Sequence, residues 1–334
     1  MDNPKYSVIV PVYNRNDEVA DLLASLDRQT ERDFEVILVE DGSTEPCTDA
    51  VERFGGNLNL QYYHKSNEGR SIARNYGIER SHGDMLIFFD SDCVIPDNYF
   101  YKLSKNLESN PLDCFGGPDA AHDSFSSVQK AINFAMTSFL TTGGIRGGKV
   151  SMEKFTPRSF NMGYTREVYN RIGGFREMFS EDIDMSMRIR NAGFQIGLIR
   201  EAAVFHKRRV NFKKFLRQVY VFGMSRITLK LLYPDSLKLV HALPAVAVIA
   251  GLACVLLSIF LSPWWLLPIG LYLAAIFISA LAGTRSVKIA ALALPASIIQ
   301  ICGYGCGFLK AWFTKIVLRR GRNVQEEIEM RRGK

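Results

Sequence analysis

From Ser7 to about Phe205, short apolar runs alternate with amphipathic segments. The runs SVIVPV, FEVILVEDG and DMLIFFDSD predict buried strands, and LQYYH predicts a weaker one. Between them, NDEVADLLASLDRQ and GRSIARNYGIERS predict helices, the first because its apolar residues fall on one helix face. Because strands alternate with helices, the pattern predicts a doubly wound, mostly parallel α/β sheet.

Polar side chains follow several of these strands at the point where each strand ends. Asn14 follows the first strand, Asp41 the second, and Asp90 and Asp92 the most apolar one. Ligands of such sheets bind outside the carboxyl ends of the strands, so these residues are candidates for a binding site. Asp41 either begins an ordinary Asp-Gly turn or accepts hydrogen bonds from a nucleotide base or ribose.

The pair Asp90 and Asp92 is typical of a cation site. Residues two apart in an extended segment point to the same side, and two carboxylates placed so repel each other unless a cation lies nearby. Mg²⁺ and Mn²⁺ prefer oxygen ligands and are often held jointly by carboxylates and phosphates. An acidic pair in a surface loop is the alternative, and the buried strand before the pair favours the metal site.

Three further groups are candidates for binding or catalysis. Arg70 and Arg74 share one helix face at i and i+4, where they face a diphosphate or form a solvated basic surface. Glu181 and Asp182 open another helix, in which acids either stabilise the N-terminus or supply a general base. His206 follows a short apolar run and is either structural or a metal ligand.

From Leu239 the composition changes to long apolar runs. LVHALPAVAVIAGLACVLLSIFL and WWLLPIGLYLAAIFISALAG carry no formal charge and are long enough to cross a bilayer. A third run, VKIAALALPASIIQICGYGCGFLKAWF, is broken by Pro295 and glycines. The positive-inside rule places Arg285, Lys288 and the basic tail in the cytoplasm, so we expect two spans and a third segment that spans, re-enters or lies in the interface. A buried helical core is the alternative.

Basic residues flank these apolar runs. The net charge is +7, and the Lys and Arg residues gather in 207–238 and near the C-terminus. This distribution is typical of juxtamembrane loops, so we expect membrane lipids and no nucleic acid as partners. The segment VNFKKFLRQVYVFGMSRITLKLLY predicts an amphipathic helix in the membrane surface, with a solvated linker helix as the alternative. The six cysteines form no CxxC pair, which indicates a reduced, cytoplasmic setting.

Two nucleotide-binding motifs have little support in the sequence. GGIRGGKV has Val150 where a phosphate loop needs Ser or Thr for Mg²⁺, so we expect a mobile loop beside the site. No G-x-G-x-x-G follows the first strand, which argues against a dinucleotide-binding fold.

Taken together, the motifs resemble the family 2 glycosyltransferases, inverting enzymes of the GT-A fold that use nucleotide-sugars. The motifs are SVIVPVYNR, EVILVEDGS, NEGRSIARNYG, FFDSD, NMGYTREVYNRIGGFREMFSEDIDMSMRIRNAGF and VFHKRR. They occur in the family's order and cover about Tyr6 to Arg209. The resemblance implies a UDP- or GDP-sugar donor and Mg²⁺ or Mn²⁺ as cofactor.

The resemblance also implies where the donor binds. Pro11, Tyr13 and Asn14 would line the nucleobase pocket, and Asp41 would hold the base or ribose. Asp90 would contact the ribose or the metal side.

The remaining implied roles concern the cation and the chemistry. Asp92 would ligate the cation, with His206 completing the metal site as in some members. Asp182, in the family's Glu-Asp pair with Glu181, would be the catalytic base. Asn161 and Gly163 would shape the sugar and acceptor pocket.

The apolar part resembles bacterial members that glycosylate envelope glycans or lipid-linked acceptors. It implies a multi-pass protein of the inner (cell) membrane with a cytoplasmic catalytic domain. We expect a GT-A domain at 1–210, an interface helix at 211–236, a transmembrane region at 237–318 and a basic cytoplasmic tail at 319–334. LRQVYVFGMSRITL has Gln218 and Arg226 but lacks the tryptophan of the processive synthases, which puts processivity in doubt.

Three functions fit this sequence. The first is sugar transfer to a hydroxyl of a lipid-linked or cell-envelope glycan. The second is transfer to a polyprenyl phosphate, which needs no strong base. The third is a non-catalytic membrane protein that binds a nucleotide-sugar, and the set Asp92, Asp182 and His206 argues against it.

Overall fold

The computed structural model of the chain describes residues 3–120, 125–143, 155–206, 211–321 and 323–324. The chain divides into two compact units, one formed by residues 1–122 and 151–207 and the other by residues 123–150 and 208–334. The second unit is therefore built from two separate segments of the sequence.

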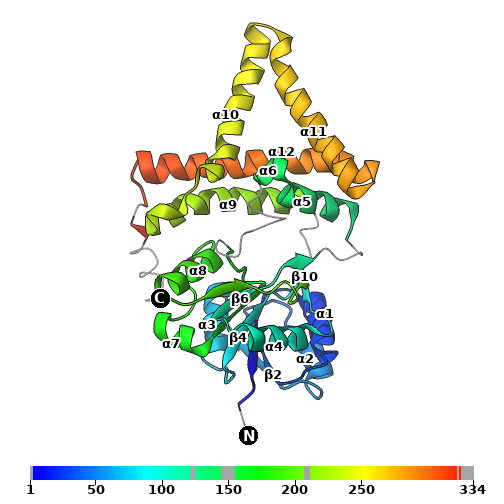
Figure 1. Cartoon of the computed structure of the whole chain (residues 1–334), viewed down its shortest axis with the longest axis vertical. Helices are drawn as coiled ribbons and strands as arrows, with labels where there is room; N and C mark the ends of the chain where they lie inside the picture. The colour runs from blue at the N-terminus through cyan, green and yellow to red at the C-terminus, as the bar shows by residue number, and fades with distance from the viewer. Residues whose placement is uncertain (1–2, 121–124, 144–154, 207–210, 322, 325–334) are drawn as a thin grey trace. The chain divides into compact units, whose positions relative to one another are not determined.

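Within the described residues, the first unit contains a seven-stranded, mostly parallel sheet (Figure 1). Its order is β3 (Leu60–Lys65), β2 (Phe34–Asp41), β1 (Tyr6–Val12), β4 (Met85–Phe89), β8 (Asn161–Thr165), β6 (Cys114–Gly116) and β9 (Ile196–Leu198). Only β8 runs against its neighbours β4 and β6 among these strands. A smaller sheet has the order β5 (Cys93–Val94), β10 (Val204–His206) and β7 (Asp119–Ala120). The predicted doubly wound sheet is confirmed.

Helices cover both faces of the large sheet. On β1, Val8 and Val10 face one layer and Ile9 faces the other, as the two-residue period of a strand requires. The first layer is formed by α1 (Asn16–Asp27), α2 (Thr48–Phe54) and α4 (Tyr99–Ser109). The second is formed by α3 (Arg70–Ile78), α7 (Arg166–Ile172) and α8 (Glu181–Asn191). The core is thus two apolar layers on either side of one sheet.

A glycine sets how closely α3 approaches the sheet. A Cβ added at Gly77 would lie 2.7 Å from Ile9 Cγ2, a distance that side chains do not tolerate. Because α3 also carries Arg70 and Arg74, this close packing fixes the height at which the two arginines stand above the strand ends.

The amino-end edge of the sheet is held together by buried Glu35. Its carboxylate accepts hydrogen bonds from Ser7 Oγ (2.6 Å), Gln61 Nε2 (2.8 Å) and the backbone N–H groups of His82 and Gly83. Burial acts to raise the pKa of Glu35, but the hydrogen bonds from Ser7, His82 and Gly83 oppose it, so that the pKa lies below its ordinary value.

The lowered pKa of Glu35 gives the first prediction. Its charged form adds stability above the unfolded-state pKa, and this contribution is lost as the pH falls through the folded-state pKa. We expect Glu35→Gln to lower the free energy of unfolding by about 1–3 kcal/mol at neutral pH. This loss of stability should shrink as the pH falls below 4.5, the ordinary pKa of a glutamate side chain. Urea unfolding followed by circular dichroism, with exposed Glu52→Gln as control, measures both effects. A Glu35→Gln variant as stable as wild type at neutral pH would contradict the assignment.

The second unit is helical throughout its described part. Its helices are α5 (Ser127–Thr137), α6 (Phe139–Thr142), α9 (Phe212–Leu232), α10 (Leu239–Phe260), α11 (Leu267–Thr284) and α12 (Val287–Ala311). Three segments are long and apolar enough to cross a membrane: Leu239–Phe260, Pro263–Thr284 and Val287–Val317. Their burial differs, since 44% of the third apolar window is buried, compared with 6% and 11% for the first two.

Helices α9 and α12 run side by side and approach closely (Figure 1). A Cβ added at Gly223 would lie 2.0 Å from Tyr304 O, and one at Gly307 would lie 2.0 Å from Tyr220 O. Glycines on both helices therefore bring the two backbones together, as small residues do in membrane helix pairs.

Some predicted segments lie outside the described residues. The motif GGIRGGKV is described only at Gly143, and the basic tail only at 319–321 and 323–324. The domain boundaries at 210, 236 and 318 stay predictions.

Candidate active site

A fully buried arginine joins three elements of the first unit. Arg74 Nη1 donates to Glu181 Oε1 (3.0 Å), and Arg74 Nη2 donates to Asp90 Oδ1 (2.6 Å). Its Nε has no partner among the described residues, and the guanidinium lies 5.4 Å from the centre of the Phe175 ring. The end of β4 and the start of α8 are therefore held to α3 by one cation.

Glu181 is the centre of this ionic chain. Its second oxygen accepts a hydrogen bond from Arg70 Nη2 at 2.8 Å, so that two arginines share one carboxylate that is 2% exposed. The Arg70 side chain is 53% exposed, and the Asp90 side chain is 32% exposed. This series of ion pairs thus runs from a buried centre to two ends that reach solvent, where a charged ligand can bind.

Asp182 follows Glu181 in the first turn of α8. Its Oδ1 accepts the N–H of Ile183 (2.8 Å), its Oδ2 lies 3.4 Å from Arg158 Nη1, and its side chain is 14% exposed. Ser180 precedes the helix with a left-handed φ of 65° and makes no side-chain capping bond. The helix start is therefore fixed by the ion pairs of its acidic residues.

Asp184, one turn into α8, holds the helix to the preceding segment. Its carboxylate pairs with Arg176 (3.1 Å) and Arg188 (2.9 Å), and Arg188 also donates to the carbonyl groups of Ile172 and Gly174. The acids at the start of α8 have distinct environments, and Asp182 is the one that is neither fully buried nor bonded to a buried arginine.

Asp41 ends β2 and organises the loop before α3. Its carboxylate accepts hydrogen bonds from Lys65 Nζ (2.8 Å) and from the N–H groups of Glu68 (3.0 Å) and Gly69 (2.8 Å). Gly69 has a φ of 99°, which favours glycine. Asp41 thus shapes the loop that leads to Arg70, and its expected contact with base or ribose stays a prediction.

The residues expected to contact the nucleobase also lie at the carboxyl ends of the strands. Asn14 follows β1 with a φ of 51°, and its Oδ1 accepts hydrogen bonds from the N–H (2.9 Å) and Oγ1 (3.0 Å) of Thr44. Pro11 is half-buried on β1, and Tyr13 is 50% exposed. The loops after β1 and β2 are therefore tied together, with an accessible ring beside them.

Asn161 and Gly163 make contacts inside the protein. Asn161 accepts a hydrogen bond from Tyr99 Oη (2.7 Å) and donates to Ala202 O (2.7 Å). A Cβ added at Gly163 would lie 2.3 Å from the ring of Phe115. They hold β8 in place, and their expected part in shaping a sugar pocket stays a prediction.

The candidate cation ligands are described only in part. Asp90 and Asp92 follow β4 and are both partly buried, whereas the side chain of His206 lies outside the described residues. No group of three or more His, Cys, Asp or Glu side chains that could hold a metal ion occurs in the described part of the chain. Two carboxylates are nevertheless a sufficient protein contribution for Mg²⁺ or Mn²⁺ when phosphates and water complete the shell.

Sequence reasoning missed two basic partners of the site. Lys65 ends β3 and pairs with Asp41 in the parallel register. A strand at LQYYH beside the strand that ends at Asp41 could therefore have predicted this contact. Arg158 has no sequence signal, because its contact with Asp182 depends on the path of the chain before β8.

Comparison with known proteins identifies the class. Residues 7–177 match the family described as Glycosyl transferase family 2, which covers half of the chain, and the chain belongs to this family. The solved structure of mannosyltransferase PcManGT from Pyrobaculum calidifontis, in complex with GDP-Man and Mn²⁺, is similar with a TM-score of 0.55 and 18% identity, covering 96% of this chain and 88% of that chain. This likeness and the sheet order confirm the expected GT-A fold.

Curated relatives are similar over parts of the sequence. An uncharacterized glycosyltransferase of Rickettsia bellii is 41% identical over 106 residues, which are 32% of this chain and 15% of that protein. Glycosyltransferase AglE of Haloferax volcanii is 24% identical over 258 residues, which are 72% of this chain and 79% of that protein. The chain thus spans only a small part of the length of the Rickettsia relative.

The two arginines on Glu181 provide a matched pair for the second prediction. Arg74→Gln leaves buried Glu181 and partly exposed Asp90 without their shared cation and should lower the free energy of unfolding by about 3–5 kcal/mol. Arg70→Gln removes a half-exposed partner and should cost less than about 1 kcal/mol. Urea unfolding of both variants measures the difference, and equal destabilisation would show that Arg74 is not the cation on which the site's folding depends.

Proposed function

We propose that this chain is a metal-dependent, inverting glycosyltransferase that moves a sugar from a nucleotide-diphosphate donor to a hydroxyl of a lipid-linked or cell-envelope glycan at the membrane. The observation that supports it most is the ionic chain Asp90–Arg74–Glu181, which joins the end of β4 to the helix start that bears Asp182. Family membership supports the class of reaction, and the three apolar segments support action at a membrane.

The donor would lie across the carboxyl ends of β1, β2 and β4. Tyr13 and Asn14 would contact the nucleobase, with Asp41 holding the base or ribose. Arg70 is the half-exposed cation of the site, and its guanidinium suits a diphosphate oxygen. Both GDP- and UDP-sugars fit this arrangement, and GDP-mannose is the first donor to test because the similar PcManGT structure contains it.

Asp90 and Asp92 would hold the Mg²⁺ or Mn²⁺ ion, with His206 as a further ligand. Their carboxylate oxygens are the donors that these ions prefer. When bound, the ion supplies positive charge that stabilises the departing nucleoside diphosphate.

Asp182 would act as the general base. Its carboxylate takes the proton of the acceptor hydroxyl while that oxygen forms a bond to the anomeric carbon of the sugar. The bond between the anomeric carbon and the diphosphate breaks, and its electron pair leaves with the diphosphate toward Arg70. A single displacement from the opposite face inverts the anomeric configuration.

The third prediction tests the base. We expect Asp182→Asn to lower the rate of transfer to a hydroxyl acceptor about 10²–10⁴-fold, because the amide takes up no proton. Purified protein is incubated with labelled GDP-mannose or UDP-sugars, Mn²⁺ and a membrane lipid extract, and sugar transfer is measured. Glu177→Gln, near α8 but outside the proposed chemistry, is the matched control.

The same experiment separates the alternatives. Unchanged transfer to polyprenyl phosphate by Asp182→Asn would identify the lipid phosphate as the acceptor, since it is already ionised. Slow release of nucleoside diphosphate that neither lipid extract nor Asp92→Ala alters would indicate a non-catalytic nucleotide-sugar protein.

The fourth prediction tests the cation. Removal of divalent ions with EDTA should abolish transfer, and excess Mn²⁺ or Mg²⁺ should restore it. Asp92→Ala should raise the Mn²⁺ concentration needed for half-maximal activity at least about tenfold, as loss of a metal-ligating group does. The exposed acid Asp97, changed to Asn, is the control. Full activity in EDTA would contradict metal dependence.

A further inference from the structure

The second unit separates its charges from its apolar surface along the chain. Between residues 211 and 318 the sequence contains ten Lys and Arg residues and one acid, Asp235, and none of these charges lies in 239–284. Helices α10 and α11, with the short helix η3 (Pro263–Leu266) between them, therefore carry no formal charge. The basic residues lie in α9, in α12 and in their flanks.

Helices α10 and α11 leave α12 as a hairpin (Figure 1). Helix α10 approaches α12 closely at Val248, whose Cγ2 would lie 2.7 Å from a Cβ added at Gly305 of α12. From Ile249 to Phe260 no residue of this described helix is buried. This free arm measures about 18 Å at 1.5 Å per residue, which is less than the roughly 30 Å of a bilayer's hydrocarbon.

Helix α12 packs against a charged helix, α9. Near the middle of α12, a Cβ added at Gly303 would lie 2.9 Å from Leu216 Cδ1 of α9. Lys213, Lys214 and Arg217 lie within one turn of Leu216 and are exposed. If α12 crossed the bilayer, these three basic side chains would be carried to its centre, where charges are strongly disfavoured.

We propose that α9 and α12 lie parallel to the membrane plane, α9 among anionic phospholipid headgroups and α12 within the near leaflet, and that only the α10–α11 hairpin crosses to the far side. A helix about 10 Å thick plus a free arm of about 18 Å adds up to about 28 Å, close to the hydrocarbon thickness. The inference rests on the membrane part of the proposed function.

The exposed side of α12 suits acyl chains. Its outward residues in the middle of the helix are Ala291, Pro295, Ile298, Cys302 and Cys306. Charges occur only toward its two ends, where Lys side chains extend to the headgroups.

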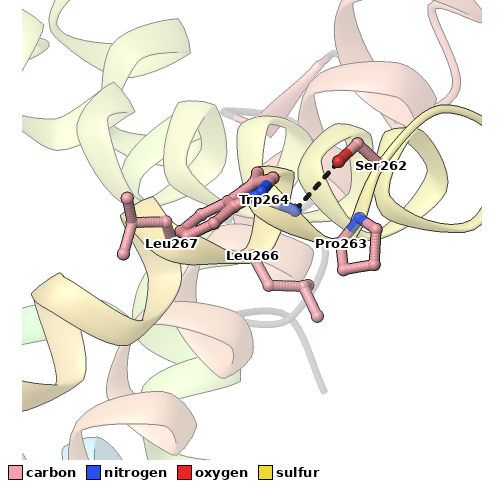
Figure 2. Close-up of a pocket in the computed structure, with 5 residues that line it drawn as sticks. All are labelled: Ser262, Pro263, Trp264, Leu266 and Leu267. Carbon is pink, nitrogen blue, oxygen red and sulfur yellow. Dashed lines mark hydrogen bonds between the residues drawn. The ribbon is translucent and has the colours of Figure 1, made fainter.

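The tip of the hairpin suits the far interface. Figure 2 shows Trp264 beside Ser262, Pro263, Leu266 and Leu267, with the backbone N–H of Trp264 donating to Ser262 Oγ at 3.4 Å. Trp264 is 77% exposed, and tryptophans gather at the boundary between headgroups and acyl chains. An exposed tryptophan tip is therefore expected at that depth.

The test places single cysteines along the full chain. Ser262→Cys marks the tip, Arg285→Cys the start of α12 and Arg320→Cys its far end, in a background in which Cys254, Cys302 and Cys306 are replaced by alanine. Asp49→Cys on α2 marks the side of the catalytic unit. The proteins are reconstituted in sealed vesicles of phosphatidylcholine and phosphatidylglycerol and treated with a membrane-impermeant maleimide before and after permeabilisation.

We expect Arg285→Cys and Arg320→Cys to be labelled from the same side as Asp49→Cys, and Ser262→Cys from the opposite side. Labelling of Arg320→Cys together with Ser262→Cys would show that α12 spans and would overturn the proposal. Labelling of Ser262→Cys on the side of Asp49→Cys would overturn the crossing hairpin. Protein that does not stay with the vesicles would refute the membrane part of the proposed function, which sugar transfer tests separately.

Tryptophan fluorescence gives a second readout that needs no cysteine, because the sequence has only three tryptophans. With Trp312→Phe the emission comes from the tip, and with Trp264→Phe and Trp265→Phe together it comes from Trp312 at the end of α12. Iodide on the side of the catalytic unit should quench Trp312 at least about threefold more than the tip. Equal quenching of both would overturn the in-plane placement.

Discussion

The buried guanidinium of Arg74 is the constraint on which the first unit depends. An isolated charge in the core is strongly unfavourable, so Arg74 is buried only because Asp90 and Glu181 accept its hydrogen bonds. Arg74 and its two partners come from α3, the start of α8 and the end of β4, and Glu181 is 107 residues from Arg74 in the sequence. Each of them therefore has its place fixed by the others, and the position of Asp182 follows from that of its neighbour Glu181.

This arrangement leaves the site stiff in its centre and open at its ends. The carboxylate of Glu181 is enclosed, whereas Arg70 and Asp90 are partly exposed. Asp41 has a similar role at the start of α3, because its carboxylate holds the loop that leads to Arg70. A charged ligand bound there would meet side chains whose orientation is already set, which favours strong electrostatic stabilisation of a departing anion.

Much of the fold could be predicted from the sequence because its signals are local. The buried runs ending at Asp41 and Phe89 and the helix that bears Arg70 and Arg74 all lie where their patterns place them. The roles of Glu181 and Asn161 could not be predicted, since a carboxylate or amide looks the same in the sequence whether it meets a ligand or another side chain. The short strands β5, β7 and β10 also lack a signal, because two or three residues show no periodicity.

The second unit takes two helices, α5 and α6, from the middle of the first unit's sequence. Ala131, Ile132 and Ala135 of α5 are buried with Phe215 of α9 and Ala296 of α12. During synthesis α5 leaves the ribosome before either partner helix exists, because α9 begins 75 residues and α12 begins 150 residues after the end of α5. A fragment cut at residue 207 would keep that uncovered face, so the first unit cannot be separated from the second by a single cut without making the fragment prone to aggregation.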